Sequence, residues 1–296
     1  MTACTRSPYD RKVSTPWLLV AIAATMLALT ASASARVPAT CDARALGMGL
    51  TYVGVLGAPT PGCTNPAAYG FDVDETAALS GVAAVPGDGP SSAFVGLRDV
   101  DRGLGAGGFA FTYRRNPKDN GCAGAMRGVY QLGKAVSQWL SVGMGIGLSR
   151  ADDDRPVLTT EAGAVLKLGA FRIGAQVSSM SATCFGDGEI DTEFSPSVSV
   201  GVALQTPGGL TIAADVHDLW SSSEEAQRWY SAGAELWLKE KVALRAGVIL
   251  DGEPGEMRAS YSGGVGFNAG RATLDYAVMG GGDRPLAHCI GASASF

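Results

Sequence analysis

Full charges occur in the middle of two strand-like runs near the C-terminal end. Glu235 lies among the alternating apolar residues of 228–238, and Arg245 lies in the same way within 242–250. If residues 239–241 form a three-residue turn, Glu235 and Arg245 face each other directly across a hairpin. The opposite face of this hairpin is aliphatic or aromatic. A charge on a lipid-facing surface costs about 2–4 kcal/mol, so we predict that both charges face a lumen and form an ion pair.

Other charged residues share the inward parity of this pair. With Glu235 and Arg245 they define a predicted lumenal charge network, which also contains Asp275, Asp215, Arg172 and Lys167. If residues 269–270 form the next turn, Gly264 lies opposite Asp275 and leaves space beside it. The mixed signs predict paired charges rather than a selectivity ring of one sign. These pairs either rigidify the wall or bind a hatch or the polar end of a solute.

Catalysis, cofactors and metals find little support in the residue patterns. His217 has inward parity near Asp215, but no Gly-x-Ser-x-Gly nucleophile motif accompanies it. The acidic residues at 152–154 match no calcium-binding spacing. The formal net charge is −5 and no basic stripe occurs, which argues against nucleic-acid binding. We therefore expect a protein that is not an enzyme and that has no catalytic residue, no metal, no cofactor and no nucleic-acid partner.

The segments that must hold these residues show apolar and polar residues alternating with a period of two, which is typical of β-strands. Fourteen strands are expected, or twelve if the first two are discounted, at 74–84, 91–98, 104–114, 123–133, 139–150, 158–168, 171–182, 194–205, 209–219, 228–238, 242–250, 259–268, 271–280 and 287–296. Most are about ten residues long, as tilted membrane-spanning strands are. Short turns alternate with longer loops, among them 183–193. This predicts an all-β fold, a single antiparallel up-and-down transmembrane β-barrel, rather than a soluble sandwich or solenoid.

Both ends of the chain fit export to the outer membrane. Residues 1–35 combine a basic start, an apolar run at 17–31 and a small-x-small site, which predicts a signal peptide. Residues 36–73 do not read as barrel strands, and 74–296 form the predicted barrel. The final strand ends on Phe296, which resembles the signal read by the barrel-assembly machinery. Outer-membrane lipid and that machinery are the expected partners.

The cysteines permit two disulfides in an oxidising compartment. Cys41 and Cys63 flank the segment before the barrel, and Cys122 and Cys184 both lie in predicted outer loops. We expect a disulfide between Cys41 and Cys63, and Cys122 and Cys184 could pair in the same way. Cys289 is then left over on the inner face.

The N-terminal part also carries a family resemblance. Residues 43–54, "ARALGMGLTYVG", followed by 64–70, "TNPAAYG", resemble the start of FadL-like and PorV-like outer-membrane barrels. Residues 233–248 and 274–278 resemble the closing hairpins of these barrels. The chain departs from the pattern at Leu50 and Thr51, and its short linker carries Cys63.

The resemblance implies a 14-stranded barrel with an N-terminal hatch folded into the lumen. Its expected hatch residues are Arg44, Gly47, Gly49, Asn65 and Pro66. Glycine permits close backbone packing, and Asn-Pro favours a turn. The alternative is a disordered periplasmic tail.

Two functions follow from the resemblance. The first is binding or passage of hydrophobic or amphipathic small molecules, as in FadL-like barrels. The second is a structural or docking partner of a protein secretion or surface-attachment system, as in PorV-like barrels. Four aromatic residues either line a cleft or form an interfacial girdle: Phe109, Trp139, Trp229 and Trp237.

Overall fold

The structure is a computed structural model of the 296-residue chain. It describes residues 42–58, 64–71, 76–85, 91–101, 105–116, 123–151, 156–186, 189–193, 196–221, 228–252, 257–281 and 284–295. The predicted signal peptide, Cys41, Cys63, Cys122 and Phe296 lie outside these ranges. The side chain of Cys184 does too, so both predicted disulfides and the insertion signal remain predictions.

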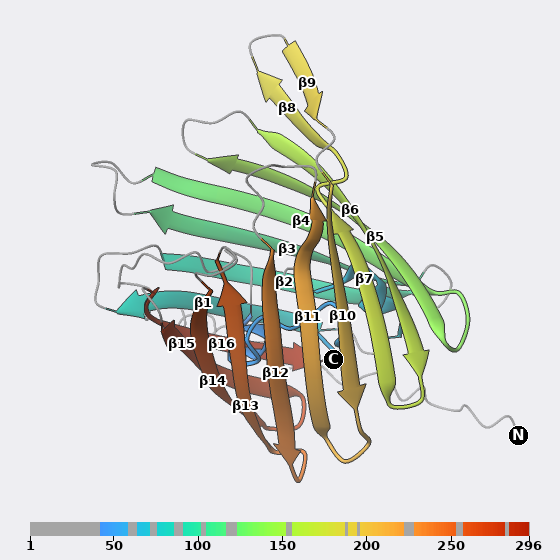
Figure 1. Ribbon diagram of the computed structural model, residues 1–296, viewed down its shortest axis with the longest axis vertical. Helices are drawn as coiled ribbons and strands as arrows, with labels where there is room; N and C mark the ends of the chain where they lie inside the picture. Colours follow the sequence, from blue (N-terminus) through green and yellow to red (C-terminus); the bar gives the residue numbers. More distant parts are fainter. Residues whose placement is uncertain are drawn as a thin grey trace, which may run out of the picture.

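Antiparallel strands in a single closed sheet form the body of the protein (Figure 1). Within the described residues fourteen strands make the ring, since β1 pairs with β16 and β5 pairs with β6. They are β1 (Thr76–Val85), β2 (Ser91–Asp101), β3 (Gly105–Asn116), β4 (Ala123–Ala135), β5 (Leu140–Ala151), β6 (Val157–Leu168), β7 (Phe171–Ser178), β10 (Ser197–Gln205), β11 (Leu210–Ser221), β12 (Trp229–Leu238), β13 (Val242–Asp251), β14 (Arg258–Asn268), β15 (Ala272–Gly281) and β16 (Arg284–Ser295). The predicted barrel of fourteen strands is confirmed.

Two further strands correct the prediction of a long loop at 183–193. β8 (Ala182–Gly186) and β9 (Glu189–Glu193) form a hairpin that projects beyond the ring (Figure 1). β8 and β9 lie between β7 and β10 in the sequence, and β7 and β10 pair with each other in the ring. β8 follows β7 after three residues and pairs with the start of β6, which attaches the β8–β9 hairpin to the wall. The sequence signal was the Asp-Gly dipeptide at 187–188, which favours a two-residue hairpin turn.

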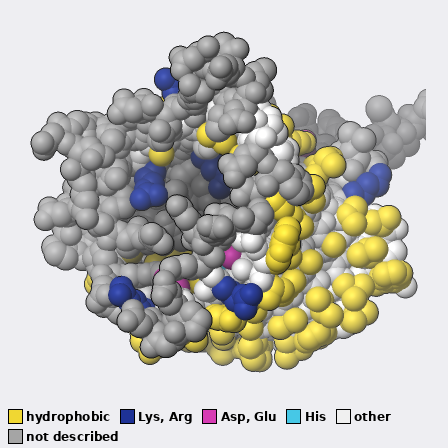
Figure 2. All heavy atoms as spheres, turned by 45° about the horizontal axis from the view of Figure 1, so that its top comes forward, with side chains coloured by type: hydrophobic (Ala, Val, Ile, Leu, Met, Phe, Trp, Pro, Cys, Tyr) yellow, Lys and Arg dark blue, Asp and Glu magenta, His cyan; other side chains and the backbone are white. Residues whose placement is uncertain are grey.

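The two faces of the wall separate by polarity as the alternation predicts. On β12 and β13, Leu236 and Leu244 are exposed on the outer face, whereas Glu235 and Arg245 are buried on the inner face. Figure 2 shows hydrophobic side chains over the outer flank and a hollow at one end in which charged side chains are visible. Aliphatic residues on the outside suit contact with hydrocarbon, and charges inside can pair away from it.

The N-terminal segment, defined as residues 42–58 and 64–71, lies inside the ring (Figure 1). It contains the short helix α2 (Ala43–Gly47) and the 3₁₀-helix η1 (Pro66–Phe71). Asp42 caps α2 by accepting a hydrogen bond from Ala45 N–H at 2.7 Å, as N-terminal capping residues do. No helix in the described part of the chain has the length and hydropathy of a membrane span.

Candidate functional site

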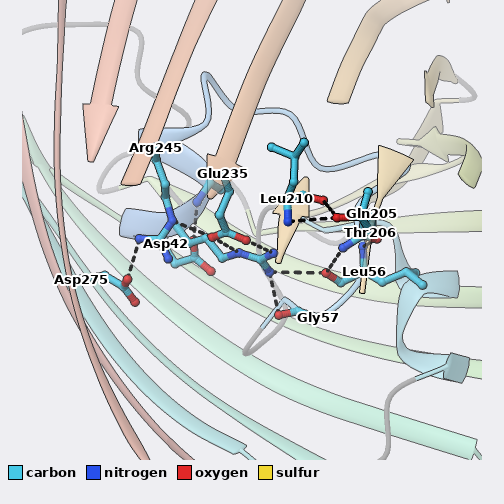
Figure 3. Close-up of polar contacts among 11 residues, drawn as sticks. Asp42, Leu56, Gly57, Gln205, Thr206, Leu210, Glu235, Arg245 and Asp275 are labelled. Carbon is cyan, nitrogen blue, oxygen red and sulfur yellow. Dashed lines mark hydrogen bonds and ion pairs between the residues drawn. The ribbon is translucent and has the colours of Figure 1, made fainter. Parts of the chain in front are cut away.

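A chain of buried charges joins the N-terminal segment to the wall (Figure 3). Arg44 in α2 donates from Nε and Nη2 to the two carboxylate oxygens of Glu235, at 3.0 and 2.9 Å. Arg245 Nε donates to Glu235 Oε2 at 2.7 Å, and Arg245 Nη1 donates to Asp275 Oδ1 at 2.6 Å. The four residues therefore alternate in sign. Such bidentate, charge-assisted hydrogen bonds fix geometry as well as charge.

The strand registers that bring these four charges together match the prediction between β12 and β13 but differ from it between β14 and β15. Glu235 is directly opposite Arg245, as residues 239–241 in the turn require. Asp275 is opposite Gly266 and not Gly264, so that expectation was wrong. The β14–β15 turn is centred one residue later than expected, on 270–271, because Ala269 N–H donates to Ala272 O across it. A glycine still lies beside the carboxylate, which leaves room for the Arg245 guanidinium.

Arg44 also holds the chain that follows α2. Its Nη1 donates to Gly57 O at 2.7 Å and lies 3.4 Å from Leu56 O. Burial alone lowers the pKa of Arg44, but the charge of Glu235 and its hydrogen bond outweigh this and raise the pKa above its ordinary value. The guanidinium therefore stays charged and links two parts of the N-terminal segment to one buried carboxylate.

A second attachment uses the backbone of the segment. Asp215 on β11 is 2 % exposed, and its Oδ2 accepts from Tyr52 N–H at 2.6 Å and Val53 N–H at 2.9 Å. Two such bonds from a loop to one carboxylate satisfy backbone groups that have no helix or strand partner. Asp215 is therefore separate from the Glu235 chain, although the two were predicted to belong to one network.

A third attachment is made by Asn65. Its amide nitrogen lies 3.0 Å from Val53 O, 3.2 Å from Ala164 O on β6 and 3.0 Å from Ala175 O on β7. Its Oδ1 accepts from Ala67 N–H at 3.0 Å, at the start of η1. The Asn65 side chain thus connects both halves of the N-terminal segment to the wall, and Pro66 begins the 3₁₀-helix that follows.

Inward-facing glycines let the segment approach the wall this closely. We call the following eight described residues the glycine belt: Gly133, Gly143, Gly163, Gly174, Gly201, Gly233, Gly247 and Gly264. Several are cross-strand neighbours, so they lie at one level of the lumen: Gly133 pairs with Gly143, and Gly143 with Gly163.

A side chain on the belt would collide with the N-terminal segment. A Cβ added at Gly174 would overlap Val53 O, and one at Gly233 would overlap Met48 O. From the other side, a Cβ at Gly49 would lie 2.9 Å from Val248 N, in a backbone conformation (φ +67°) that glycine tolerates. The sequence analysis considered only Gly264 among these glycines and missed their alignment.

The remaining predicted charges lie elsewhere. Lys167 and Arg172 face each other across the β6–β7 hairpin and contact neither Glu235 nor Asp275 through any described bond. Of the hatch residues, Gly47 packs against the Arg245 side chain, with 3.3 Å from a Cβ position to Arg245 Cδ. Cys289 is free and buried on the inner face.

His217, Asp215 and Ser231 meet in the lumen, but their geometry is not that of a catalytic triad. His217 Nε2 lies 3.3 Å from Ser231 Oγ and 3.7 Å from Asp215 Oδ2. A triad needs the base to contact the nucleophile with one ring nitrogen and the carboxylate with the other. Here both groups approach the same nitrogen. The described residues also contain no group of three or more His, Cys, Asp or Glu side chains arranged to hold a metal.

Aromatic and apolar side chains gather beside this histidine. The His217 and Trp229 rings stack at a centroid separation of 3.6 Å, and the centroid of the Tyr52 ring lies 5.2 Å from that of His217. Tyr52 and Trp229 pack against a buried apolar cluster of segment and wall, made of Ala43, Ala45, Leu46, Leu50, Ile249, Ala277, Met279, Ala287 and Cys289. Of the four aromatics weighed from the sequence, Trp229 faces the lumen, Phe109 is exposed on the outside, and Trp139 is exposed in the β4–β5 turn.

No protein-family model matches the sequence, and no curated protein matches it. Solved structures do match. The Ralstonia pickettii toluene transporter TbuX is 14 % identical, with a TM-score of 0.65, and the P. putida toluene transporter TodX is 13 % identical, with a TM-score of 0.62. The monoaromatic hydrocarbon channel CymD is 12 % identical, with a TM-score of 0.63. Each alignment covers 88 % of this chain and 99 % of the other.

These neighbours are FadL-family barrels, so the FadL-like fold expected from the sequence is confirmed. They are transport proteins and not enzymes. At these identities the likeness establishes the fold alone.

Proposed function

We propose that this protein is an outer-membrane barrel through which hydrophobic small molecules bind and pass. The observation that carries the proposal is the fold, a closed 14-stranded barrel shared with two toluene transporters and a monoaromatic hydrocarbon channel. The apolar outer face and the buried inner charges support a position in a membrane. The expected hydrophobic or amphipathic ligand and the expected outer-membrane location belong to this proposal.

The N-terminal segment acts in this proposal as a hatch across the lumen. Three sets of contacts support that role: Arg44 with Glu235, Asp215 with the Tyr52–Val53 backbone, and Asn65 with β6 and β7. A solute that crosses the barrel must pass between this segment and the wall or displace it. The tight fit on the glycine belt favours displacement of part of the segment.

The aromatic side chains of Trp229 and Tyr52 in the lumen form the proposed binding site for an apolar solute. Trp229 and Tyr52 adjoin the apolar cluster where the segment meets the wall, and aromatic faces bind other aromatic rings by stacking and edge contacts. Trp229 is stacked on a histidine that is 2 % exposed, so its ring has a fixed orientation. Fixed apolar surfaces lower the entropic cost of binding.

Uptake by whole bacteria tests this function, because an outer membrane rich in lipopolysaccharide is the barrier that a phospholipid vesicle lacks. Cells that express the protein should take up labelled toluene faster than cells with an empty vector. Trp229→Ala should reduce this gain, and Trp139→Ala, which changes an exposed residue in the β4–β5 turn, should retain it. Uptake equal to that of the empty-vector cells would refute the proposal.

A docking role remains the second candidate because of one observation, the hairpin β8–β9 that projects beyond the ring. A secretion or surface-attachment partner would find there a strand, β9, that pairs on one side with β8 and has no described strand on its other side. Deletion of residues 182–193 separates the two functions. Toluene uptake and secretion that both persist after the deletion favour passage alone, and loss of secretion without loss of uptake favours docking.

A further inference from the structure

Two positive charges face each other inside the barrel near its short-turn end. Lys167 on β6 and Arg172 on β7 are direct cross-strand partners, two residues on either side of the turn at 169–170. Both have the inward parity of Val165 and Gly174. Like charges placed directly opposite each other destabilise a hairpin, so this arrangement needs a compensating negative charge.

The Arg172 guanidinium is held in place but only partly used. Its Nη1 donates to Phe171 O at 2.9 Å and to Gly169 O, so the turn itself fixes the side chain. Arg172 is 7 % exposed, yet its Nε has no hydrogen-bond partner. Within the described chain no bond involves Nη2 either. The free Nε–Nη2 edge is the planar fork that binds a carboxylate or phosphate through two parallel hydrogen bonds.

Lys167 adds a second positive group on the same side. Its Nζ lies 5.3 Å from the centroid of the Phe71 ring, at the end of η1. None of the ion pairs among the described residues includes Lys167 or Arg172. Across the same lumen, by contrast, Arg44 and Arg245 are both saturated by carboxylates.

We propose that Lys167 and Arg172 form an oxyanion-binding site at the short-turn mouth of the lumen. The ligand is a carboxylate or a phosphate, held bidentately by the Arg172 Nε–Nη2 edge and neutralised by Lys167. The phosphate would come from a free phosphate ion, and the carboxylate from an amphipathic acid. The site does not depend on the proposed passage of hydrophobic molecules.

Calorimetric titration of the folded protein in nonionic detergent tests this site, with inorganic phosphate and benzoate as separate probes. We expect saturable binding of at least one probe. Lys167→Gln and Arg172→Gln should each weaken it about tenfold or more, since each removes a charge-assisted contact to the ligand. Lys241→Gln, which removes an exposed charge at the same end of the barrel, should leave it unchanged. Binding of benzoate alone identifies a carboxylate site, and binding of phosphate alone identifies a phosphate site.

Saturable binding of neither probe would overturn the proposal, as would equal affinity in the wild type and both variants. A second measurement needs no variant. The thermal unfolding midpoint of the wild-type protein should rise with the concentration of the bound anion, relative to chloride at equal ionic strength, because the ligand binds only the folded state. A midpoint that is the same in chloride and in both probes would also overturn the proposal.

Discussion

Gly174→Ala tests whether the N-terminal segment depends on the glycine belt. A Cβ at this position would overlap Val53 O and lie 2.9 Å from Gly54 Cα, so the segment has to move away from β7. Val53 O also receives the Asn65 amide, so the same displacement weakens the third attachment. Overpacking of this kind costs about 1–3 kcal/mol. If that cost falls on docking, the undocked population of the segment rises about 5- to 150-fold.

The assay compares single-channel conductance in planar bilayers with limited proteolysis of the N-terminal segment. Gly174→Ala should raise both the open fraction and the cleavage rate, while heat-modifiability on a gel shows that the barrel still folds. Gly263→Ala is the matched control, because a Cβ at this outward position finds only Arg245 O at 3.8 Å. Conductance and cleavage equal to those of the wild type, or equally changed in the control, would refute the reasoning.

Two further substitutions test the inner and outer faces of the same hairpin. Glu235→Gln should lower the free energy of unfolding by about 3–5 kcal/mol, because it leaves Arg44 and Arg245 buried without their shared charge. Urea unfolding measures this change. The control Glu240→Gln, in the exposed turn, should change the free energy of unfolding by less than about 0.5 kcal/mol. A Glu235→Gln midpoint that matches the control contradicts the buried chain. Ala246→Arg on the outer face should destabilise the lipid-embedded barrel by about 2–4 kcal/mol. Val242→Arg, on the same face but beside the turn, should destabilise it by only about 0–1 kcal/mol. Equal effects of the two substitutions would contradict a lipid-facing wall.

Local pairing was predictable because it depends on neighbouring residues. The alternation of apolar and polar residues assigns Leu236 to one face and Glu235 to the other, and a three-residue turn then places Glu235 opposite Arg245. The β14–β15 register was missed because the turn is centred one residue later than assumed, which shifts the partner of Asp275 by two positions. The β8–β9 hairpin was missed because its acidic residues were interpreted as a loop despite the Asp-Gly turn signal.

The sequence by itself determined which residues face lipid and which face the lumen, because a strand has a period of two and one face had to be apolar. It could not determine what fills the lumen. Arg44 and Glu235 are 191 residues apart, and Asn65 and Ala175 are 110 apart. Parity says only that such residues point inward. Closure of the ring brings glycines from separate strands to one level, makes room for the N-terminal segment, and leaves Lys167 and Arg172 facing each other without a carboxylate among the described residues.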